Sequence, residues 1–376
     1  MCVVSARPNY MKIKPVMAAL SARGCDSVLV HTGQHYDHAL SGVFLDELGM
    51  PAPDHLLGAG SGTHAEQTAR TMTAFEPLVA ALRPDAVVVA GDVNGTLACA
   101  LVAAKGGALV AHVEAGLRSG DWAMPEEINR VATDRLSDYL FAPSPDAVAN
   151  LRQEGYRPDQ IHLTGNVMAD TVLDNLGRAR TRPVLGQLGL HRGQFGLVTL
   201  HRPSNVDDPG VLGALLSALG DIARDLPLVF PVHPRTRRRL GSRPVPGLML
   251  TDPLGYLDFL ALQDGAALVL TDSGGVQEET TVLGVPCLTL RESTERPVTV
   301  SEGTNRVVGR DPIRIAAAAR DVLANPPAPH RPALWDGRAG ERIAEILLAG
   351  GGPADRLRPT SRAAGVTAHA LAGSPA

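Results

Sequence analysis

The sequence predicts an α/β fold made of two doubly wound domains, each with a parallel sheet covered by helices on both faces. Over residues 1–168 one unit recurs, in which an apolar strand is followed by a polar turn and then by a helix. This repeat is typical of a parallel sheet. The same rhythm restarts near Val198, so we expect a second sheet in the remainder of the chain.

The expected elements follow from short apolar runs between helical patterns. Strands of the first domain are expected at 2–5, 27–32, 86–90, 108–113, 139–142 and 161–163. Its helices are expected at 14–23, 64–82, 95–105, 127–137 and 145–154. Strands of the second domain are expected at 196–200, 228–232, 248–250, 267–271 and 287–290. The join is placed within 165–193, an amphipathic helix is expected at 334–348, and the Gly-, Ala-, Pro- and Arg-rich stretch 350–376 is expected to be a disordered tail.

Composition indicates a soluble globular protein of two domains. The chain has 376 residues, 44% of them hydrophobic and 20% charged, with a net charge of -4. Neither a nucleic-acid surface nor an anionic-membrane surface is expected from this balance, and the apolar runs are shorter than the ~18 residues that a membrane span needs. The first residues lack the pattern of a secretion signal, and the four cysteines have no metal or redox spacing. We therefore expect a cytoplasmic protein with free thiols and without a metal site.

The stretch 268–286, LVLTDSGGVQEETTVLGVP, predicts a site for a diphosphate. It is interpreted as a buried strand, a tight turn at Ser273, Gly274 and Gly275, and the start of a helix. A helix N-terminus carries free N–H groups and a partial positive charge, and glycines let a ligand's oxygens approach the backbone. Glu278 and Glu279 follow, where a carboxylate either caps the helix or accepts hydrogen bonds from a ribose. Many such turns only cap a helix.

Charged residues follow most of the predicted strands. In open parallel sheets ligands bind beyond the carboxyl ends of the strands, and two facing sheets would bring these residues into one cleft. The side chains that are cationic, or become so on protonation, suit a diphosphate and are Arg7, Lys12, His201, Arg202 and Arg296. The carboxylates suit general acid and base work and are Asp92, Glu114 and Glu126. Phe259 either stacks on a base or belongs to the core.

No cofactor is expected. The glycine-rich stretch 58–63, GAGSGT, lacks the GxGxxG spacing after a strand, and no GxxxxGK[ST] loop occurs. The sequence therefore predicts neither nicotinamide nor ATP binding.

Taken together, these residues resemble the non-hydrolysing UDP-N-acetylglucosamine 2-epimerase family. The matching runs cover the chain from its start to about residue 310 in the order of the family. They are ARPNYMKIKP (6–15), TGQHYD (32–37), GSGTHAEQT (60–68), GDVNGT (91–96), HVEAGLRSGD and PEEINR (112–130), TGN (164–166), TLHRPSN (199–205), PVHPRT (231–236), TDSGGVQEE (271–279) and TERP (294–297).

The resemblance implies a GT-B type fold, with two Rossmann-like domains facing across a cleft. The N-terminal domain would then comprise 1–168 and the returning helix 338–349, and the C-terminal, UDP-binding domain 169–337. It implies inversion at C2 by elimination of UDP to a 2-acetamidoglucal and re-addition of UDP. The substrate would be a UDP-sugar, and the protein is expected to be a homodimer.

The resemblance also implies residue roles. Asp92 and Glu126 match the acid and base candidates at C2, Glu114 the third carboxylate, and His201 a catalytic diphosphate contact. Arg7 matches a diphosphate contact, Glu279 a ribose contact and Arg296 a cation of the cleft. Together with the residues chosen for their own chemistry, the predicted substrate-binding set is Arg7, Lys12, Arg130, His233, Phe259, Ser273, Gly274, Gly275, Glu279 and Arg296. Some bacterial members need a second UDP-sugar for activity, and Gln34, His35 and Arg70 match that allosteric site. The sequence departs from the family's HRxEN motif, because Ser204 stands where the family has Glu.

Other activities fit the same residues. One is a hydrolysing epimerase that releases N-acetylmannosamine, and another is an epimerase of a modified sugar such as a 2,3-diacetamido uronate. A GT-B glycosyltransferase and a non-catalytic nucleotide-sugar binding protein are further alternatives. The three carboxylates favour epimerisation.

Overall fold

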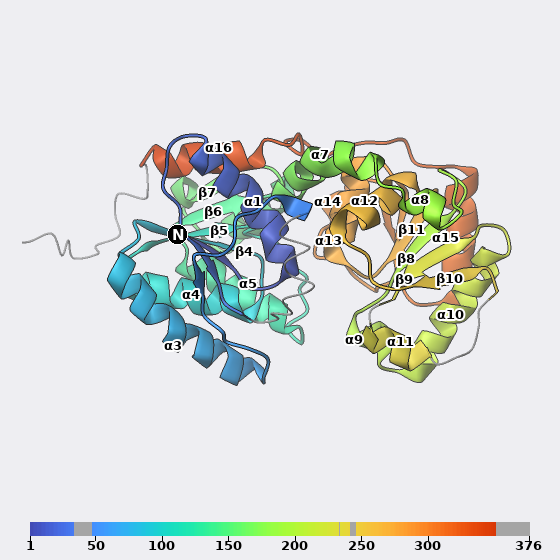
Figure 1. Cartoon of the computed structure of the whole chain (residues 1–376), viewed down its shortest axis with the longest axis horizontal. Helices are drawn as coiled ribbons and strands as arrows, with labels where there is room; N and C mark the ends of the chain where they lie inside the picture. Colours follow the sequence, from blue (N-terminus) through green and yellow to red (C-terminus); the bar gives the residue numbers. More distant parts are fainter. Residues whose placement is uncertain (34–46, 233, 241–245, 351–376) are drawn as a thin grey trace, which may run out of the picture.

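The computed structural model describes residues 1–33, 47–232, 234–240 and 246–350, and it contains two parallel sheets (Figure 1). The first sheet has the order β3-β2-β1-β4-β5-β6-β7 and the second β10-β9-β8-β11-β12-β13. Every strand pair in both is parallel. The strand order reverses beside β1 in one sheet and beside β8 in the other, as in a doubly wound fold. The predicted fold class is confirmed.

The strands are short and mostly buried, which explains their near-continuous apolar sequences. Those of the N-terminal domain are β1 (Cys2–Val4), β2 (Leu29–His31), β3 (His55–Leu56), β4 (Ala86–Ala90), β5 (Leu109–Val113), β6 (Tyr139–Ala142) and β7 (Ile161–Leu163). Those of the C-terminal domain are β8 (Gly196–Thr199), β9 (Leu228–Pro231), β10 (Leu248–Thr251), β11 (Leu268–Thr271), β12 (Cys287–Thr289) and β13 (Asn305–Val307). The sequence did not reveal β3 (HL) and β13 (NRV), because His55, Asn305 and Arg306 leave no apolar run in these short segments.

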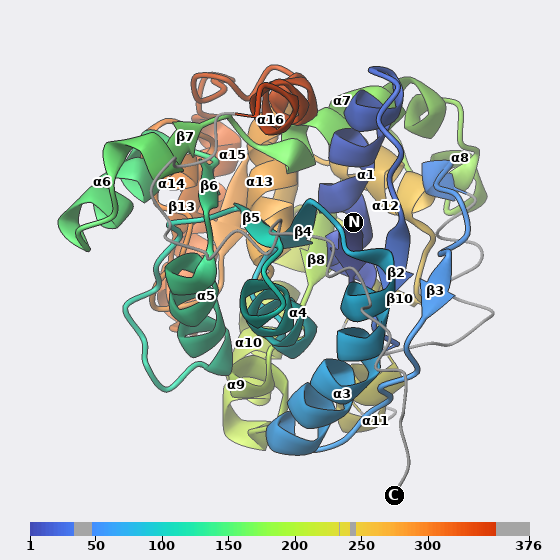
Figure 2. The same cartoon turned by 90° about the vertical axis from the view of Figure 1, so that its left-hand side faces the viewer.

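Helices cover both faces of each sheet. In Figure 2, α1 and α16 lie on one side of the N-terminal sheet and α3, α4 and α5 on the other. The helices of this domain are α1 (Arg7–Ser21), α3 (His64–Leu82), α4 (Asn94–Lys105), α5 (Pro125–Leu136), α6 (Pro145–Gln153) and the returning α16 (Ala339–Leu348), with the 3₁₀ turn η1 (Pro158–Gln160). The connector and C-terminal domain contain α7 (Val167–Arg180), α8 (Val184–Gln187), α9 (Pro203–Val206), α10 (Pro209–Ala223), α11 (Pro234–Leu240), α12 (Tyr256–Gly265), α13 (Gly274–Leu283), α14 (Val298–Ser301) and α15 (Pro312–Ala324).

The first helix begins earlier than expected, at Arg7 rather than at residue 14, and it continues through Pro15. A proline inside a helix lacks the N–H that would bond to the carbonyl four residues before it. Here that carbonyl is Met11 O, and it accepts a hydrogen bond from Thr171 Oγ1 at 2.5 Å. A side chain of the connector α7 thus satisfies the group that Pro15 leaves open, which sequence patterns alone do not show.

The last helix begins later than expected, at Ala339 rather than at residue 334. Leu334 and Gly337 both have left-handed φ values, of 65° and 85°, which no α-helix continues through. Trp335 is buried instead, and its Nε1 donates to Pro143 O at 3.0 Å. Gly340 lets α16 approach α1 closely, because a Cβ there would lie 2.6 Å from backbone atoms of Pro15.

Asp170 of α7 holds the start of α16. Its two carboxylate oxygens accept from Ala339 N at 3.1 Å and from Gly340 N at 2.7 Å. Burial raises the pKa of Asp170 to about 6, although these two hydrogen bonds oppose the shift. The returning helix is therefore attached to the connector by a buried carboxyl group with a raised pKa.

We expect Asp170→Asn to change how stability depends on pH. The folded-state pKa of Asp170 lies above its unfolded value, so the folded state binds more protons between pH 4 and 6, and the unfolding free energy falls as pH rises through that window. The shift corresponds to a change on the order of 2–3 kcal/mol. Denaturant unfolding at pH 4 and pH 7 should show that wild type loses stability relative to the variant on going to pH 7. If the difference in unfolding free energy between wild type and variant is the same at pH 4 and pH 7, this expectation is contradicted.

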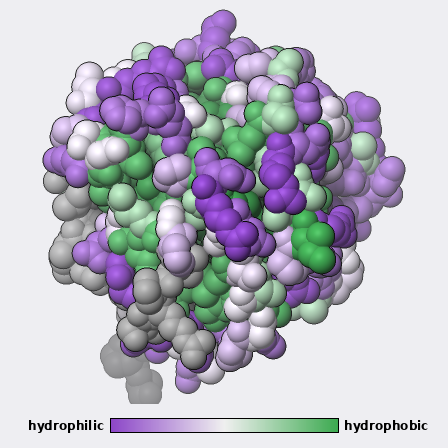
Figure 3. Space-filling model, turned by 90° about the vertical axis from the view of Figure 1, so that its right-hand side faces the viewer, coloured by the Kyte–Doolittle hydropathy of each residue, from purple (hydrophilic) through white to green (hydrophobic). Residues whose placement is uncertain are grey.

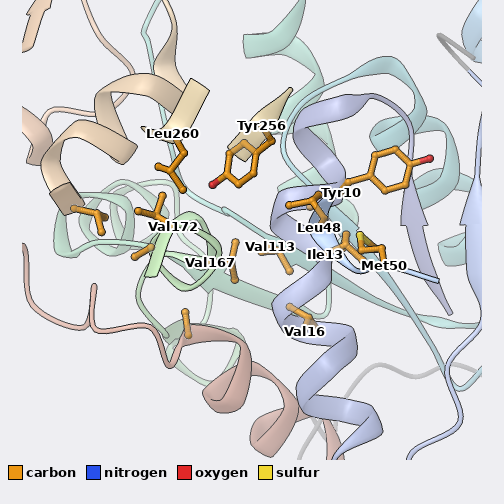
Figure 4. Close-up of a cluster of buried hydrophobic side chains, with 14 of the residues drawn as sticks. Tyr10, Ile13, Val16, Leu48, Met50, Val113, Val167, Val172, Tyr256 and Leu260 are labelled. Atoms are coloured by element: carbon orange, nitrogen blue, oxygen red, sulfur yellow. The ribbon is translucent and has the colours of Figure 1, made fainter. Parts of the chain in front are cut away.

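A continuous apolar core joins the two domains. Figure 4 shows side chains of α1, α7 and α12 meeting, with Ile13, Val172 and Leu260 among them. All three are fully buried and belong to one cluster. Because α7 contacts helices of both domains, it fixes the N-terminal sheet relative to the C-terminal one.

The outer face of the C-terminal domain has hydrophilic side chains interspersed with apolar ones (Figure 3). Among the described residues, every helix is too short or too polar to cross a lipid bilayer.

Candidate active site

Asp92 lies just beyond the carboxyl end of β4 and is fixed from two directions. Its side chain pairs with the guanidinium of Arg130 on α5, and its backbone carbonyl accepts from Asn129 Nδ2 at 2.9 Å. About 26% of the side chain stays exposed. Burial would raise the pKa of Asp92, but Arg130, Lys12 and Arg296 outweigh it and lower the pKa below its ordinary value. Asp92 is therefore ionised at neutral pH and able to accept a proton.

Glu114 follows β5 and has an unusual backbone conformation. Its φ is 69°, in the left-handed region that residues other than glycine seldom adopt. The side chain is buried and pairs with Lys12 of α1. Gly91 completes this contact, since a Cβ there would lie 2.9 Å from Lys12 Nζ. Backbone strain of this kind persists only where the surroundings impose it and clusters at functional sites.

Glu126 lies in the first turn of α5, one turn before Arg130. It is half-buried, and it forms no ion pair with any residue that the structure describes. Its neighbour Glu127 points inward instead and accepts from the backbone N–H groups of Ser119 and Gly120 at 2.9–3.1 Å. The helix thus presents Glu126 while Glu127 holds the preceding loop.

The diphosphate half of the predicted site lies at the N-terminus of α13. Ser273 is the N-cap residue but makes no side-chain cap hydrogen bond, so the first-turn N–H groups are available to an anion. Gly274 is closely approached by charged groups. A Cβ there would lie 2.7 Å from Glu295 Oε1 and 2.9 Å from Arg296 Nη1. In Figure 1, α13 and α14 lie on the side of the C-terminal domain that faces the N-terminal domain.

We expect Gly274→Ala to weaken UDP binding about tenfold, equivalent to about 1.4 kcal/mol. The φ of Gly274 is not left-handed, so the effect comes from the added methyl group, which displaces Arg296 and Glu295. Isothermal titration calorimetry with UDP measures the change. Gly213→Ala on α10 is the matched control, because a Cβ there meets nothing within 4 Å. Equal UDP affinity in wild type and Gly274→Ala would contradict the placement of the diphosphate.

Arg296 connects carboxylates of both domains. Its Nε lies 2.9 Å from Glu278 Oε1, its Nη1 3.1 Å from Glu295 Oε1, and its Nη2 3.8 Å from Glu114 Oε2. Burial disfavours its charge, yet Glu278, Glu114 and Glu295 together raise the pKa of Arg296 well above its usual range. Arg296 is therefore a permanent cation at the junction of the domains.

The carboxylates around Arg296 differ in protonation. Burial raises the pKa of Glu278 to about 7, an effect that Arg296 opposes and Glu114 reinforces. Burial also acts on Glu295, but there Arg296, Arg291 and Arg202 outweigh it and lower the pKa to about 2. Glu278 in addition accepts from Asn166 Nδ2 at 2.9 Å, at the start of the connector α7. Glu295 is thus a fixed anion, whereas Glu278 readily takes up a proton.

His201 follows β8 and is held by Asp272. Its Nδ1 lies 2.9 Å from Asp272 Oδ1, and its backbone N–H donates to the same carboxylate at 3.0 Å. Burial would raise the pKa of Asp272, but its hydrogen bonds and charge interaction with His201 lower it. The His201 side chain is 52% exposed and so remains accessible to a ligand.

The structure therefore brings together part of the predicted set. Arg296, Glu114 and Lys12 form one linked array, Asp92 with Arg130 lies within its electrostatic field, and Gly274 adjoins Arg296. Phe259 on α12 is partly buried and packs against the core cluster, and its stacking on a base stays a prediction. Glu279 is buried and accepts from Gln263 Nε2 at 2.7 Å, so it does not point outward in this conformation.

Some predicted residues lie elsewhere or outside the described part. Arg70 is exposed on α3, where its Nη2 donates to Ser61 O at 2.7 Å. Gln34, His35 and His233 lie outside the described residues, as does the side chain of Arg7. A pocket of about 460 Å³ lies beyond β9 and β10, and Arg237 and Asp252 are among its lining residues. Another lining residue, Val232, directly precedes His233 in the sequence.

Sequence reasoning missed Asn166, Glu278 and Glu295 as members of the charged array. Each stands within a matched motif, namely TGN, QEE and TERP, which was the available signal. Most of their partners lie far away along the chain, so the sequence did not show which residue of each motif faces the site. Among the described residues, no group of three His, Cys, Asp or Glu side chains is arranged to hold a metal ion.

Two doubly wound parallel-sheet domains, with Arg296 contacting Glu114 of one and Glu278 and Glu295 of the other, have the architecture of the GT-B class. The sequence profile of the family described as UDP-N-acetylglucosamine 2-epimerase matches residues 18–348. The chain belongs to this family and is therefore an isomerase.

Individual relatives are similar over nearly the whole chain. A UDP-N-acetylglucosamine 2-epimerase of Methanocaldococcus jannaschii is 41% identical over 93% of this chain and 98% of its own. The crystal structure of the M. jannaschii enzyme in complex with UDP-GlcNAc and UDP matches with a TM-score of 0.86 over 93% of this chain and 99% of that one. A UDP-2,3-diacetamido-2,3-dideoxy-D-glucuronate 2-epimerase of Pseudomonas aeruginosa is also 41% identical, over 92% of this chain and 98% of its own.

Proposed function

We propose that this protein interconverts UDP-N-acetylglucosamine and UDP-N-acetylmannosamine by elimination and re-addition of UDP through a 2-acetamidoglucal, without hydrolysis. The observation that carries the proposal is the position of Arg296, which contacts Glu114 of one domain and Glu278 and Glu295 of the other. A sugar nucleotide whose diphosphate lies at Arg296 has its sugar beside the carboxylates of the N-terminal domain. The 41% identity to the M. jannaschii enzyme supports the same substrate.

The elimination step separates a proton and a diphosphate from neighbouring carbons. A carboxylate removes the proton from C2, the C1–C2 double bond forms, and the electron pair of the C1–O bond leaves with UDP. Asp92 is the proposed base, since it is ionised and partly exposed. Glu126 is the proposed acid that returns a proton to the other face of C2, and UDP then adds back to C1.

The C-terminal domain stabilises the leaving group. Charge develops on the diphosphate as the C1–O bond breaks, and fixed donors aimed at that charge lower the barrier. The N–H groups at the start of α13, Arg296 and the exposed His201 are the proposed donors. Glu114, held by Lys12, is proposed to bind the sugar or assist the proton transfers.

A second candidate is epimerisation of a 2,3-diacetamido uronate linked to UDP. The observation favouring it is the equal identity of 41% to the P. aeruginosa enzyme that carries this name. Both candidates use the same carboxylates at C2, and they differ in the groups that contact C3 and C6. The homodimer, the cytoplasmic location and the allosteric role of Gln34, His35 and Arg70 stay predictions.

Proton NMR of the protein with UDP-GlcNAc tests the proposal. We expect UDP-ManNAc to accumulate to a fixed ratio with UDP-GlcNAc and no free sugar to appear. Free N-acetylmannosamine with UDP would instead indicate the hydrolysing reaction. Conversion of the diacetamido uronate alone would favour the second candidate, and turnover that requires an acceptor would indicate a glycosyltransferase.

A further inference from the structure

His112 is a buried histidine on β5 whose two ring nitrogens both have partners. Its Nδ1 lies 2.6 Å from Asp134 Oδ1 on α5, and its Nε2 lies 2.8 Å from Gly91 O. A backbone carbonyl oxygen can only accept, so Nε2 is the donor to Gly91 O. The side chains of His112 and Asp134 are both 0% exposed, which excludes direct contact with a substrate.

His112 contacts the residue directly before Asp92, the proposed base. Gly91 directly precedes Asp92, and its carbonyl is one of three consecutive carbonyls held by side chains. Ala90 O accepts from Asn9 Nδ2 and Thr96 Oγ1 at 2.8 and 2.9 Å, and Asp92 O accepts from Asn129 Nδ2 at 2.9 Å. The turn that carries Asp92 is thus fixed by donors from α1, α4, β5 and α5.

Asp134 contacts residues on both sides of Glu114, through the side chain of His112 and the backbone N–H of Gly116. Asp134 bonds to His112, two residues before Glu114, and its Oδ2 accepts from Gly116 N at 3.1 Å, two residues after it. Arg118 Nη2 lies 2.8 Å from the same oxygen. The left-handed φ of Glu114 falls within this short span.

Asp134 also belongs to the helix that carries the remaining groups of the site. It follows Arg130, the partner of Asp92, by four residues, and so lies on the same face of α5 one turn later. Glu126 lies on the first turn of that helix. A single buried pair therefore bonds to all three segments that bear Asp92, Glu114 and Glu126.

We propose that His112 and Asp134 are positioning residues that set the relative placement of the three carboxylates around C2 of the sugar. This rests on the proposed function, since the carboxylates matter only if they act on one substrate. The pair acts through the backbone of Gly91 and Gly116 and through α5. A displacement of about 1 Å at reacting groups costs on the order of 100-fold in rate, so a loss of this network should appear in kcat.

Two conservative variants separate the two contacts of His112. In His112→Gln the amide nitrogen reaches about as far as Nε2, so the bond to Gly91 O is retained and the bond to Asp134 is lost. In His112→Asn the amide nitrogen stands near Nδ1, so the reverse holds. His162→Gln is the matched control, because His162 lies on β7 of the same sheet outside the network.

The test compares kcat with UDP-GlcNAc, UDP affinity by calorimetry, and backbone hydrogen exchange over residues 88–96. We expect both variants to lower kcat with unchanged UDP affinity: His112→Asn about 100-fold, because the turn before Asp92 is released, and His112→Gln by up to about tenfold, because the bond to Asp134 is lost. Residues 88–96 should exchange faster in His112→Asn and unchanged in His162→Gln. Wild-type kcat in both His112 variants, or equal loss of kcat, UDP affinity and thermal stability in both, would overturn the proposal.

The hydrogen-exchange measurement also separates this inference from the proposed function. If wild type fails to epimerise UDP-GlcNAc, the proposed function is wrong, and exchange over 88–96 still decides whether His112 fixes this turn. Unchanged exchange in His112→Asn would then overturn the inference by itself. If wild type epimerises UDP-GlcNAc, the kcat values of the two variants decide.

Discussion

Asp92→Asn is expected to lower kcat for epimerisation by about 10³-fold, within the range that a positioned general base contributes. Asparagine has nearly the same shape and still has an oxygen that faces Arg130, but it cannot take a proton from C2. UDP affinity should change little, because the proposed diphosphate contacts belong to the other domain. NMR rates and calorimetry with UDP measure the two effects separately.

Asp85→Asn is the matched control for Asp92→Asn. Asp85 directly precedes β4 and is exposed. It therefore lies where the strands begin, whereas Asp92 lies beyond the ends of the strands, and its replacement should leave kcat unchanged. If Asp92→Asn still exchanges the C2 proton with solvent, Glu126 or Glu114 must be the base. Because the pKa of Asp92 is lowered, its contribution to the rate should persist down to about pH 4 and be lost only below that.

Arg296→Met is expected to cause the largest loss of stability, about 3–5 kcal/mol, because it leaves buried carboxylates without their cation. Glu278, Glu295 and Glu114 all lie within 4 Å of the guanidinium and are almost fully buried. UDP affinity should fall about 10- to 100-fold, as expected for loss of a charge-assisted hydrogen bond. Denaturant unfolding and calorimetry with UDP test both parts.

Arg306→Met serves as the control for Arg296→Met. Arg306 pairs with Asp321 on the surface, where both side chains are about half exposed, and such pairs contribute little to stability. Arg296→Lys retains the charge but not the three-way contact, and we expect intermediate stability and affinity. Stability and UDP affinity equal to wild type in Arg296→Met would contradict the role given to this residue.

The sequence predicted most strands because buried parallel strands have a simple composition. It also predicted where Asp92 and Glu114 lie, since Glu114 directly follows β5 and Asp92 is the second residue after β4. It predicted α1 poorly, since Pro15 suggests a helix start and the compensating Thr171 lies far along the chain. It also missed β3, because His55 leaves no apolar run in this short segment.

The interior of the site was less predictable. The sequence left open which of the adjacent Glu278 and Glu279 caps the helix or faces a ligand, and the family resemblance implied a ribose contact for Glu279. In the structure Glu278 contacts Arg296, and Glu279 accepts from Gln263. Both are buried, and only the packing of α12 and α7 against α13 decides which one meets which partner. The network of His112 was invisible for the same reason, because it joins residues 91, 112 and 134 through tertiary contacts.

The most direct test is the fate of the C2 proton when wild-type protein acts on UDP-GlcNAc in D₂O. A carboxylate that removes this proton exchanges it with solvent, so we predict one deuterium at C2 of the UDP-ManNAc formed, and at C2 of UDP-GlcNAc recovered at equilibrium. Mass spectrometry and NMR of the separated sugars measure it. Epimer formed with hydrogen retained at C2, or substrate returned unchanged and unlabelled, would contradict the view that the two domains act together on one sugar nucleotide.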